Sequence, residues 1–141
     1  MKYLELLKTE RGCPFCNISE EHTIIKNENA TLTYSLAPYH PDHLLIVPNR
    51  HIEEILAVSP EELHDIDALQ KKALELLHKL GYKNISILVR EGEKTGRTIP
   101  HLHYHVIPDT VLGDLNHKGS ERDILTEEEI KILMTKLRSL N

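Results

Sequence analysis

Three histidines recur at every second position in residues 101–107, which read His-Leu-His-Tyr-His-Val-Ile. Alternate side chains of a β-strand point to the same face, so this spacing predicts three imidazoles on one face, roughly 6–7 Å apart. Imidazole can act near neutral pH as a nucleophile, a proton carrier or a metal ligand. Two chemical interpretations follow, a zinc site built on His-x-His or covalent catalysis by one imidazole, beside the alternative of a strand with a merely polar face.

The chain has two cysteines, Cys13 and Cys16, in the sequence Cys-Pro-Phe-Cys. Two thiols so close together do not form a disulfide framework, and they indicate a metal-binding or redox dithiol, or thiols without a function. A glutaredoxin-like redox pair follows a hydrophobic strand, whereas a polar, charged segment, residues 8–12, precedes this one. The sequence pattern alone leaves these interpretations open.

Length and composition indicate one soluble globular domain. The chain has 141 residues, of which 40% are hydrophobic and 28% charged, which is ordinary for a domain with a real core. The net charge of −5 argues against binding to nucleic acid or to an anionic membrane. The sequence shows no membrane-spanning or signal segment, so we expect a cytoplasmic protein.

The elements that must position these residues follow from hydrophobic periodicity and helix capping. We expect a short helix over residues 1–9, and a hairpin of strands at 23–26 and 30–36. A strand buried on both faces is expected at 43–47, and a long helix from Ser59-Pro60 to Gly81. A strand at 84–91, the histidine strand and a final helix capped by Thr126 complete the series. This order predicts an α+β fold, a mostly antiparallel sheet with helices packed on one side.

The histidine strand resembles the signature of the histidine triad family, His-φ-His-φ-His-φ-φ with φ apolar. Residues 43–51, His-Leu-Leu-Ile-Val-Pro-Asn-Arg-His, are similar to a second segment of that family, and Gly92 and residues 96–98 stand where it has its glycine-rich approach to the triad. The resemblance covers residues 13–109. It implies a single domain over residues 1–141, with residues 110–141 forming a C-terminal tail and helix.

The resemblance implies a nucleotide hydrolase or transferase that acts at an α-phosphate through a covalent nucleotidyl-histidine intermediate. The substrate would be a small-molecule nucleotide, either a dinucleoside polyphosphate or a nucleoside phosphoramidate, and no catalytic cofactor would be needed. His103 would be the nucleophile, with His101 and His105 as its catalytic support. The expected substrate-binding residues are Ser35, His43, Gly96, Arg97 and Thr98.

Some relatives also bind structural zinc, and by position the ligands here would be Cys13, Cys16, His51 and His101. Family members are commonly homodimers joined through the sheet and the long helix. Ser35 stands where relatives often have Asp or Asn, Asp42 where many have Gly, and Arg97 where many have Gln. With Arg90 and Lys94 nearby, Arg97 either favours a longer polyphosphate chain or a phosphorylated leaving group, or is a solvated surface charge.

Two other functions fit the same residues. The triad could itself hold a catalytic zinc, in which case chelation abolishes activity directly. Alternatively, the chain is a non-catalytic nucleotide-binding or scaffold protein with a vestigial site, which binds nucleotides without turnover.

Overall fold

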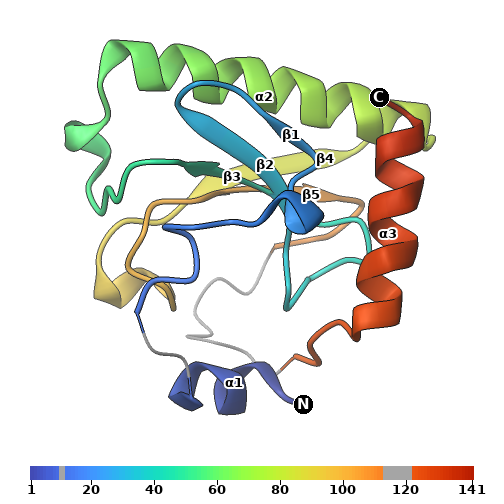
Figure 1. Cartoon of the computed structure of the whole chain (residues 1–141), viewed down its shortest axis with the longest axis horizontal. Coiled ribbons are helices and arrows are strands. Elements are labelled where there is room, and N and C mark those ends of the chain that lie inside the picture. The colour runs from blue at the N-terminus through green and yellow to red at the C-terminus, as the bar shows by residue number, and fades with distance from the viewer. Residues whose placement is uncertain (10–11, 113–121) are drawn as a thin grey trace.

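A computed structural model describes residues 1–9, 12–112 and 122–141 of the chain. In chain order, the helices and strands are α1 (Tyr3–Thr9), β1 (Ile25–Lys26), β2 (Ala30–Tyr34), β3 (Leu44–Pro48), α2 (Pro60–Lys79), β4 (Ile85–Val89), β5 (Tyr104–Pro108) and α3 (Glu127–Ser139). Short 3-10 helices occupy Glu20–His22, Ile55–Ala57 and Glu93–Thr95. Figure 1 shows the sheet lying between α2 on one side and α1 on the other.

The sheet is antiparallel throughout, with strand order β1-β2-β3-β5-β4. β3 lies in the middle and every one of its residues is buried, as its continuous apolar run predicts. β4 forms one edge of the sheet. The predicted α+β fold with an antiparallel sheet is confirmed.

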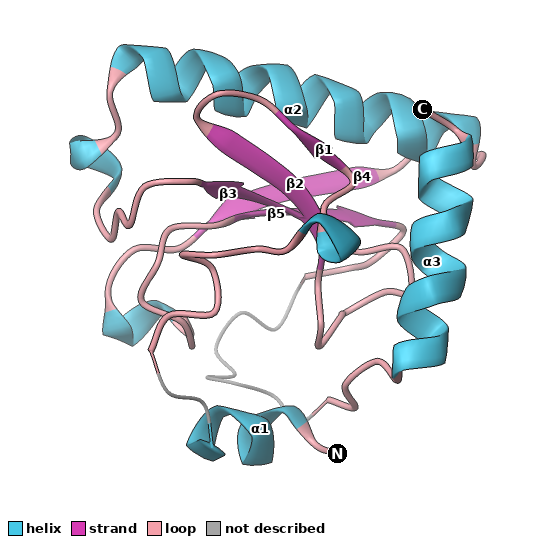
Figure 2. Cartoon of the chain, in the orientation of Figure 1, coloured by secondary structure: helices cyan, strands magenta, loops and turns pink. Residues whose placement is uncertain are grey.

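The helices do not all lie on one side of the sheet, contrary to expectation. α2 and α3 share one apolar core with the sheet, and α1 lies on the opposite face (Figure 2). α1 is held there by long-range bonds: the Tyr3 N–H donates to the Arg122 carbonyl at 3.0 Å, and the Tyr3 hydroxyl meets the Thr98 hydroxyl at 2.6 Å. None of the helices in the described part of the chain has the length and apolar character of a membrane span.

The histidine strand begins three residues later than predicted, at Tyr104 instead of His101. The ladder between β3 and β5 runs only from Leu44↔Val106 to Ile46↔Tyr104. Beyond it, Pro48 has no N–H to donate and its carbonyl accepts from the His101 ring at 2.8 Å. His101 and His103 therefore precede the strand, and the three imidazoles do not share one strand face.

The first turn of α2 contains a buried acid, Glu62, whose replacement we expect to lower the stability of the fold. Ser59 and Glu62 form a reciprocal capping box, and Arg50 donates to both Glu62 carboxylate oxygens, at 2.7 and 3.2 Å. The hydrogen bond from Arg50 lowers the pKa of Glu62, so this stabilisation is present above the ordinary value of 4.5 and is lost as the pH falls through the depressed one.

We therefore expect Glu62→Gln to lower the melting temperature near neutral pH by about 3 °C, and the gap from the native protein to close in acid. Glu61→Gln is the matched control, because Glu61 lies in the same helical turn but is exposed. Thermal melts from pH 7 to pH 3 measure the difference. A constant gap across this range would contradict the assignment.

Candidate functional site

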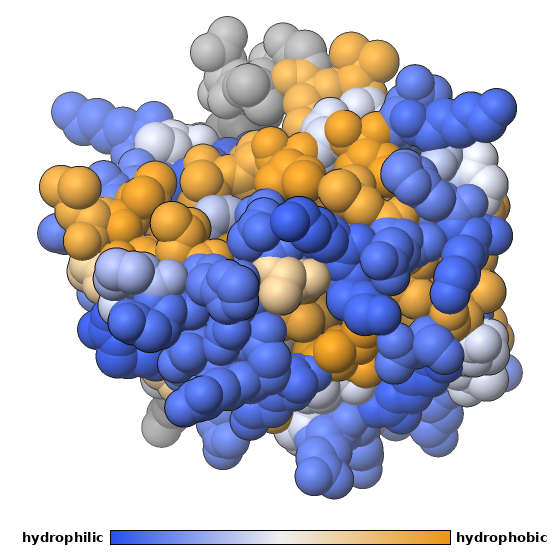
Figure 3. Space-filling view, turned by 90° about the horizontal axis from the view of Figure 1, so that it is seen from above, coloured by the Kyte–Doolittle hydropathy of each residue, from blue (hydrophilic) through white to orange (hydrophobic). Residues whose placement is uncertain are grey.

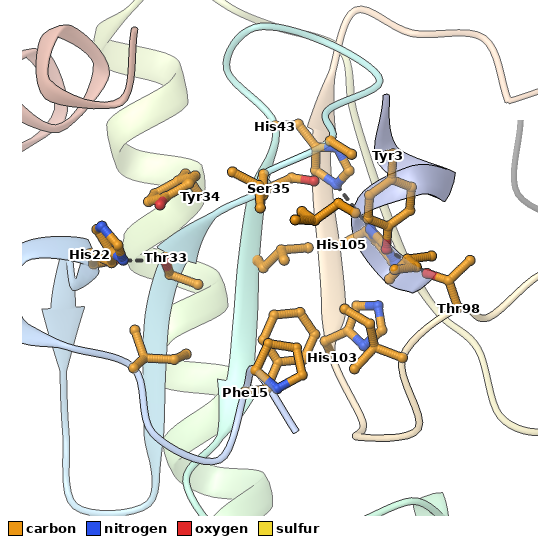
Figure 4. A pocket seen from close by; sticks show the side chains of 18 of the residues that line it. Tyr3, Phe15, His22, Thr33, Tyr34, Ser35, His43, Thr98, His103 and His105 are labelled. Atoms are coloured by element: carbon orange, nitrogen blue, oxygen red, sulfur yellow. Dashed lines mark hydrogen bonds between the residues drawn. The ribbon is translucent and has the colours of Figure 1, made fainter. Parts of the chain in front are cut away.

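A cavity of about 340 Å³ lies on the face of the sheet that α1 covers. The structure brings most of the predicted site residues to its wall: Ser35, His43, Gly96, Arg97, Thr98, His103 and His105. Figure 4 shows Ser35, His43, His103 and His105 converging there, with Phe15 against His103. His101 does not line the cavity, because its ring turns toward the cysteines.

The protonation pattern of His103 follows from its hydrogen bond. Its Nδ1 lies 2.7 Å from the His101 backbone carbonyl, which can only accept, so Nδ1 carries the hydrogen and Nε2 keeps its lone pair. Burial lowers the pKa of His103 to about 4, against the opposing effect of that carbonyl. His103 is therefore a neutral imidazole with one basic nitrogen, the form that acts as a nucleophile.

His105 has the opposite tautomer to His103, and a chain of hydrogen bonds through His43 determines it. The Tyr39 backbone N–H donates to His43 Nδ1 at 3.1 Å, so the hydrogen of His43 is on Nε2 and is donated to His105 Nδ1, 2.9 Å away. His105 consequently carries its own hydrogen on Nε2. Its ring centroid lies 4.8 Å from that of His103, so a ring with a hydrogen on Nε2 neighbours a ring with a lone pair on Nε2.

The two hydrogen-bonded histidines, His43 and His105, are both neutral imidazoles. Burial is the main cause of the low pKa of His43, about 3, and the Arg122 charge adds to it. Burial likewise holds the pKa of His105 well below its usual range, with nearby charges contributing. Neutral rings of this kind donate hydrogen bonds and are poor sources of a proton.

A second cluster, Cys13, Cys16, His51 and His101, could hold a metal ion. Its four ligand atoms lie within 4.8 Å of one another. Cys13 Sγ is 3.2 Å from His101 Nδ1, Cys16 Sγ is 3.1 Å from His51 Nδ1 and 3.6 Å from His101 Nδ1. Tetrahedral zinc with ordinary Zn–S and Zn–N bonds holds such atoms roughly 3.5 Å apart, so the spacing fits.

The orientation of His101 also fits a ligand. Its Nε2 donates to the Pro48 carbonyl at 2.8 Å, which leaves the lone pair of Nδ1 directed at the two thiols. Phe15, between the cysteines, packs against His103 with ring centroids 5.0 Å apart. The metal-ligand loop therefore forms part of the cavity wall.

Two contributors to the cavity have no signal in the sequence pattern. Tyr3 comes from α1, and Arg122 from the segment before α3. The Arg122 guanidinium lies over the Tyr39 ring at 4.1 Å and the Tyr3 ring at 5.1 Å. Both residues are far in sequence from the triad, so only the folded chain brings them to it.

The residue before His43 is a buried acid with two partners. The Asp42 carboxylate accepts from the Tyr82 hydroxyl and from Lys136 of α3. The bond to Asp42 raises the pKa of Tyr82 to about 12. Asp42, which stands where many relatives have Gly, thus attaches α3 to the loop that presents His43.

Comparisons with known proteins identify the family and the fold. The family model described as "HIT domain" matches residues 18–111. An uncharacterized HIT-like protein of Methanocaldococcus jannaschii is 29% identical over 100 residues, 68% of this chain and 78% of that protein. The asymmetrical bis(5'-nucleosyl)-tetraphosphatase of Schizosaccharomyces pombe is 32% identical over 75 residues, 52% of this chain and 41% of that protein. A Zn-bound histidine triad family protein from Mycobacterium smegmatis superposes with a TM-score of 0.67 and 24% identity, over 91% of this chain and 94% of the other.

Proposed function

Because the chain belongs to the HIT domain family, we propose that it is a nucleotide hydrolase that cleaves at an α-phosphate through a nucleotidyl-histidine intermediate on His103. One observation carries this proposal: the His101 carbonyl fixes the hydrogen of His103 on Nδ1 and leaves Nε2 with its lone pair beside the cavity. The tetraphosphatase from Schizosaccharomyces pombe supports the choice of a dinucleoside polyphosphate as substrate.

In the proposed reaction, His103 Nε2 attacks the α-phosphorus and forms an N–P bond. The bond from phosphorus to the leaving group breaks, and the leaving group keeps its electron pair. Water then attacks the same phosphorus, the N–P bond breaks with its electron pair returning to His103 Nε2, the water loses a proton to the solvent, and a nucleoside monophosphate leaves. The His105 Nε2–H donates a hydrogen bond to a phosphate oxygen in both steps and keeps its proton, and His43 fixes the tautomer of His105.

The remaining predicted residues have positioning roles in this proposal. The Thr98 hydroxyl and the backbone at Gly96 hold phosphate oxygens, and Arg97 supplies positive charge near His103. Ser35 lies on the opposite side of the cavity from Thr98, where the nucleoside would lie (Figure 4). The orientation of His101 toward the cysteines argues against a catalytic zinc held by all three triad rings.

We propose structural zinc for the cluster of two cysteines and two histidines. The donor set and its spacing support a closed four-ligand site, and the Zn-bound neighbour has the same fold. A closed site supplies no open position for chemistry. Its contribution would be to fasten the loop that carries Phe15 beside His103.

A homodimer is also proposed. β4 is an edge strand with Ile87 42% exposed, and α2 exposes Leu63 at 55%. Figure 3, seen from the α2 side, shows apolar side chains among the charged ones. Light scattering at micromolar concentration should give twice the mass of one chain, and a monomer would contradict the proposal. A cytoplasmic location and a single domain over residues 1–141 stay predictions.

Product analysis tests the proposed function. The purified protein is incubated with diadenosine tetraphosphate, adenosine 5'-phosphoramidate and a nucleotide sugar, and we expect a nucleoside monophosphate from at least one of them. Nucleotide binding without turnover of any member, even at high enzyme concentration, would instead support the non-catalytic binding protein.

A further inference from the structure

Three arginines line the cavity, although the chain is acidic overall. It has 22 acidic and 17 basic residues and a net charge of −5. Among the described residues that line the cavity are Arg90, Arg97 and Arg122, and no Asp or Glu. We call these three the arginine cluster. So much positive charge in one cavity favours an anionic ligand.

Two members of the arginine cluster, Arg90 and Arg97, have no close acidic partner among the described residues. Arg97 lies 3.9 Å from an exposed Glu53 carboxylate, the outer limit of an ion pair, and its Nη1 donates a long hydrogen bond of 3.4 Å to the Glu53 carbonyl. For Arg90, the part of the chain that the structure describes contains no ion pair. Lys94, which the sequence placed in the same group, is exposed and does not line the cavity.

Arg122 lies at a defined end of the cavity. Its guanidinium lies over the rings of Tyr39 and Tyr3. The Tyr39 ring stacks on His43 with centroids 5.7 Å apart. The Tyr3 hydroxyl forms a hydrogen bond with the Thr98 hydroxyl. Figure 4 shows Tyr3 and Thr98 on one side of His103 and His105, with His22, Thr33 and Tyr34 on the other. A substrate centred on His103 therefore has one part beside Tyr3 and Thr98, and the other beside Thr33 and Tyr34.

We propose that Arg122 is a specificity-determining residue of this site: together with Arg90 and Arg97 it binds the phosphates of the leaving group, so that the polyphosphate substrate proposed above is preferred to a phosphoramidate. The inference rests on the proposed function and assigns a residue that sets its preference between substrates. An amine or a neutral alcohol as leaving group is correspondingly disfavoured.

The charge that develops on the leaving group when the P–O bond breaks agrees with this assignment. When His103 Nε2 bonds to the α-phosphorus, the bridging P–O bond breaks and its electron pair stays on the departing oxygen. A polyphosphate carries that charge without taking up a proton, and guanidinium groups stabilise it. An amine must be protonated to depart, and His105, held neutral by burial, is a poor proton source.

The test compares two substrates that share the adenylyl group, diadenosine tetraphosphate and adenosine 5'-phosphoramidate. We expect Arg122→Gln to lower kcat/KM for the tetraphosphate by about 10- to 100-fold and for the phosphoramidate by less than about 3-fold. Arg122→Lys, which keeps the charge, should recover part of the loss. Lys71→Gln, which removes an exposed charge on α2, should change neither. The Arg122 carbonyl that holds Tyr3 is unaffected by these substitutions, and melting temperatures check the fold.

Equal losses on both substrates would overturn the proposal, because Arg122 would then act on the shared adenylyl group or on the fold. Binding of inorganic tripolyphosphate, measured by calorimetry, separates this proposal from the proposed function. Arg122-dependent binding by a protein that hydrolyses no member of the three-substrate panel supports the anion site and refutes the hydrolase. Hydrolysis of the phosphoramidate, with no tripolyphosphate binding, supports the hydrolase and refutes the anion site.

Discussion

His103→Asn should lower kcat by about 10⁴-fold or more while nucleotide affinity changes little. Asparagine is close in size to imidazole and keeps a donor for the His101 carbonyl, but it has no nitrogen lone pair that can bond to phosphorus. The loss should therefore affect the chemical step alone. Steady-state kinetics with the best substrate of the panel, together with calorimetric binding of the nucleoside monophosphate, measure the two quantities.

His78→Asn is the matched control, because it makes the same substitution at an exposed position of α2. The native protein should also yield, after an acid-free quench, a nucleotidyl adduct on the peptide that contains His103. An adduct on another residue, or a variant that keeps more than a tenth of the native rate, would refute the assignment of the nucleophile.

The sheet and the longer helices were predictable because their signals are local. The continuous apolar run of residues 43–47 predicts a strand buried on both faces, and β3 is buried throughout. Ser59, Pro60 and Glu62 predict the start of α2, where the capping box is present. Each of these features depends on neighbours within a few residues of one another.

The start of β5 was not predictable from alternation. A period of two indicates extended backbone but does not say which residues find a partner strand. Here the partner ends in Pro48, and the Leu102 N–H donates to the Ile52 carbonyl instead. The result separates His101 from the other two histidines, so one ring faces the thiols and two face the cavity.

The positions of the ring hydrogens of His43 and His105, and the cavity wall that α1 forms, could not be predicted from the sequence either. The tautomers of His43 and His105 depend on the Tyr39 amide, which only a turn of the folded chain directs at His43. Arg122 reaches the cavity because residues 1–3 and 122–124 pair through backbone bonds. Pairing between segments so far apart in sequence has no local signature.

The second large effect expected is the loss of metal and stability in Cys16→Ser. Cys16 Sγ contacts both ligand nitrogens of the cluster, His51 Nδ1 and His101 Nδ1, so its replacement removes a ligand atom from the centre of the set. A bound ion at about 1,000 times its Kd contributes about 4 kcal/mol to the free energy of unfolding. At about 3 °C per kcal/mol for a chain of this size, the melting temperature should fall by about 10 °C.

Metal analysis should find one zinc per native chain and much less than one in the variant. His51→Gln removes a different ligand of the same ion and should reproduce the loss, whereas His64→Gln removes an exposed imidazole of α2 and should not. Equal melting temperatures for the native protein and Cys16→Ser would show that the cluster holds no ion that matters to the fold.

Chelation of the native protein then distinguishes a structural from a catalytic metal. A catalytic zinc predicts that the rate falls with metal content at every temperature. If the zinc is structural, its removal should lower the melting temperature. Below that temperature, the rate should fall only to the extent that Phe15 loses its position against His103. This indirect loss should raise KM more than it lowers kcat, because Phe15 lines the cavity and His103 keeps its bond to the His101 carbonyl. Chelation that abolishes kcat with KM unchanged would contradict the nucleophilic mechanism and favour the metal-dependent one.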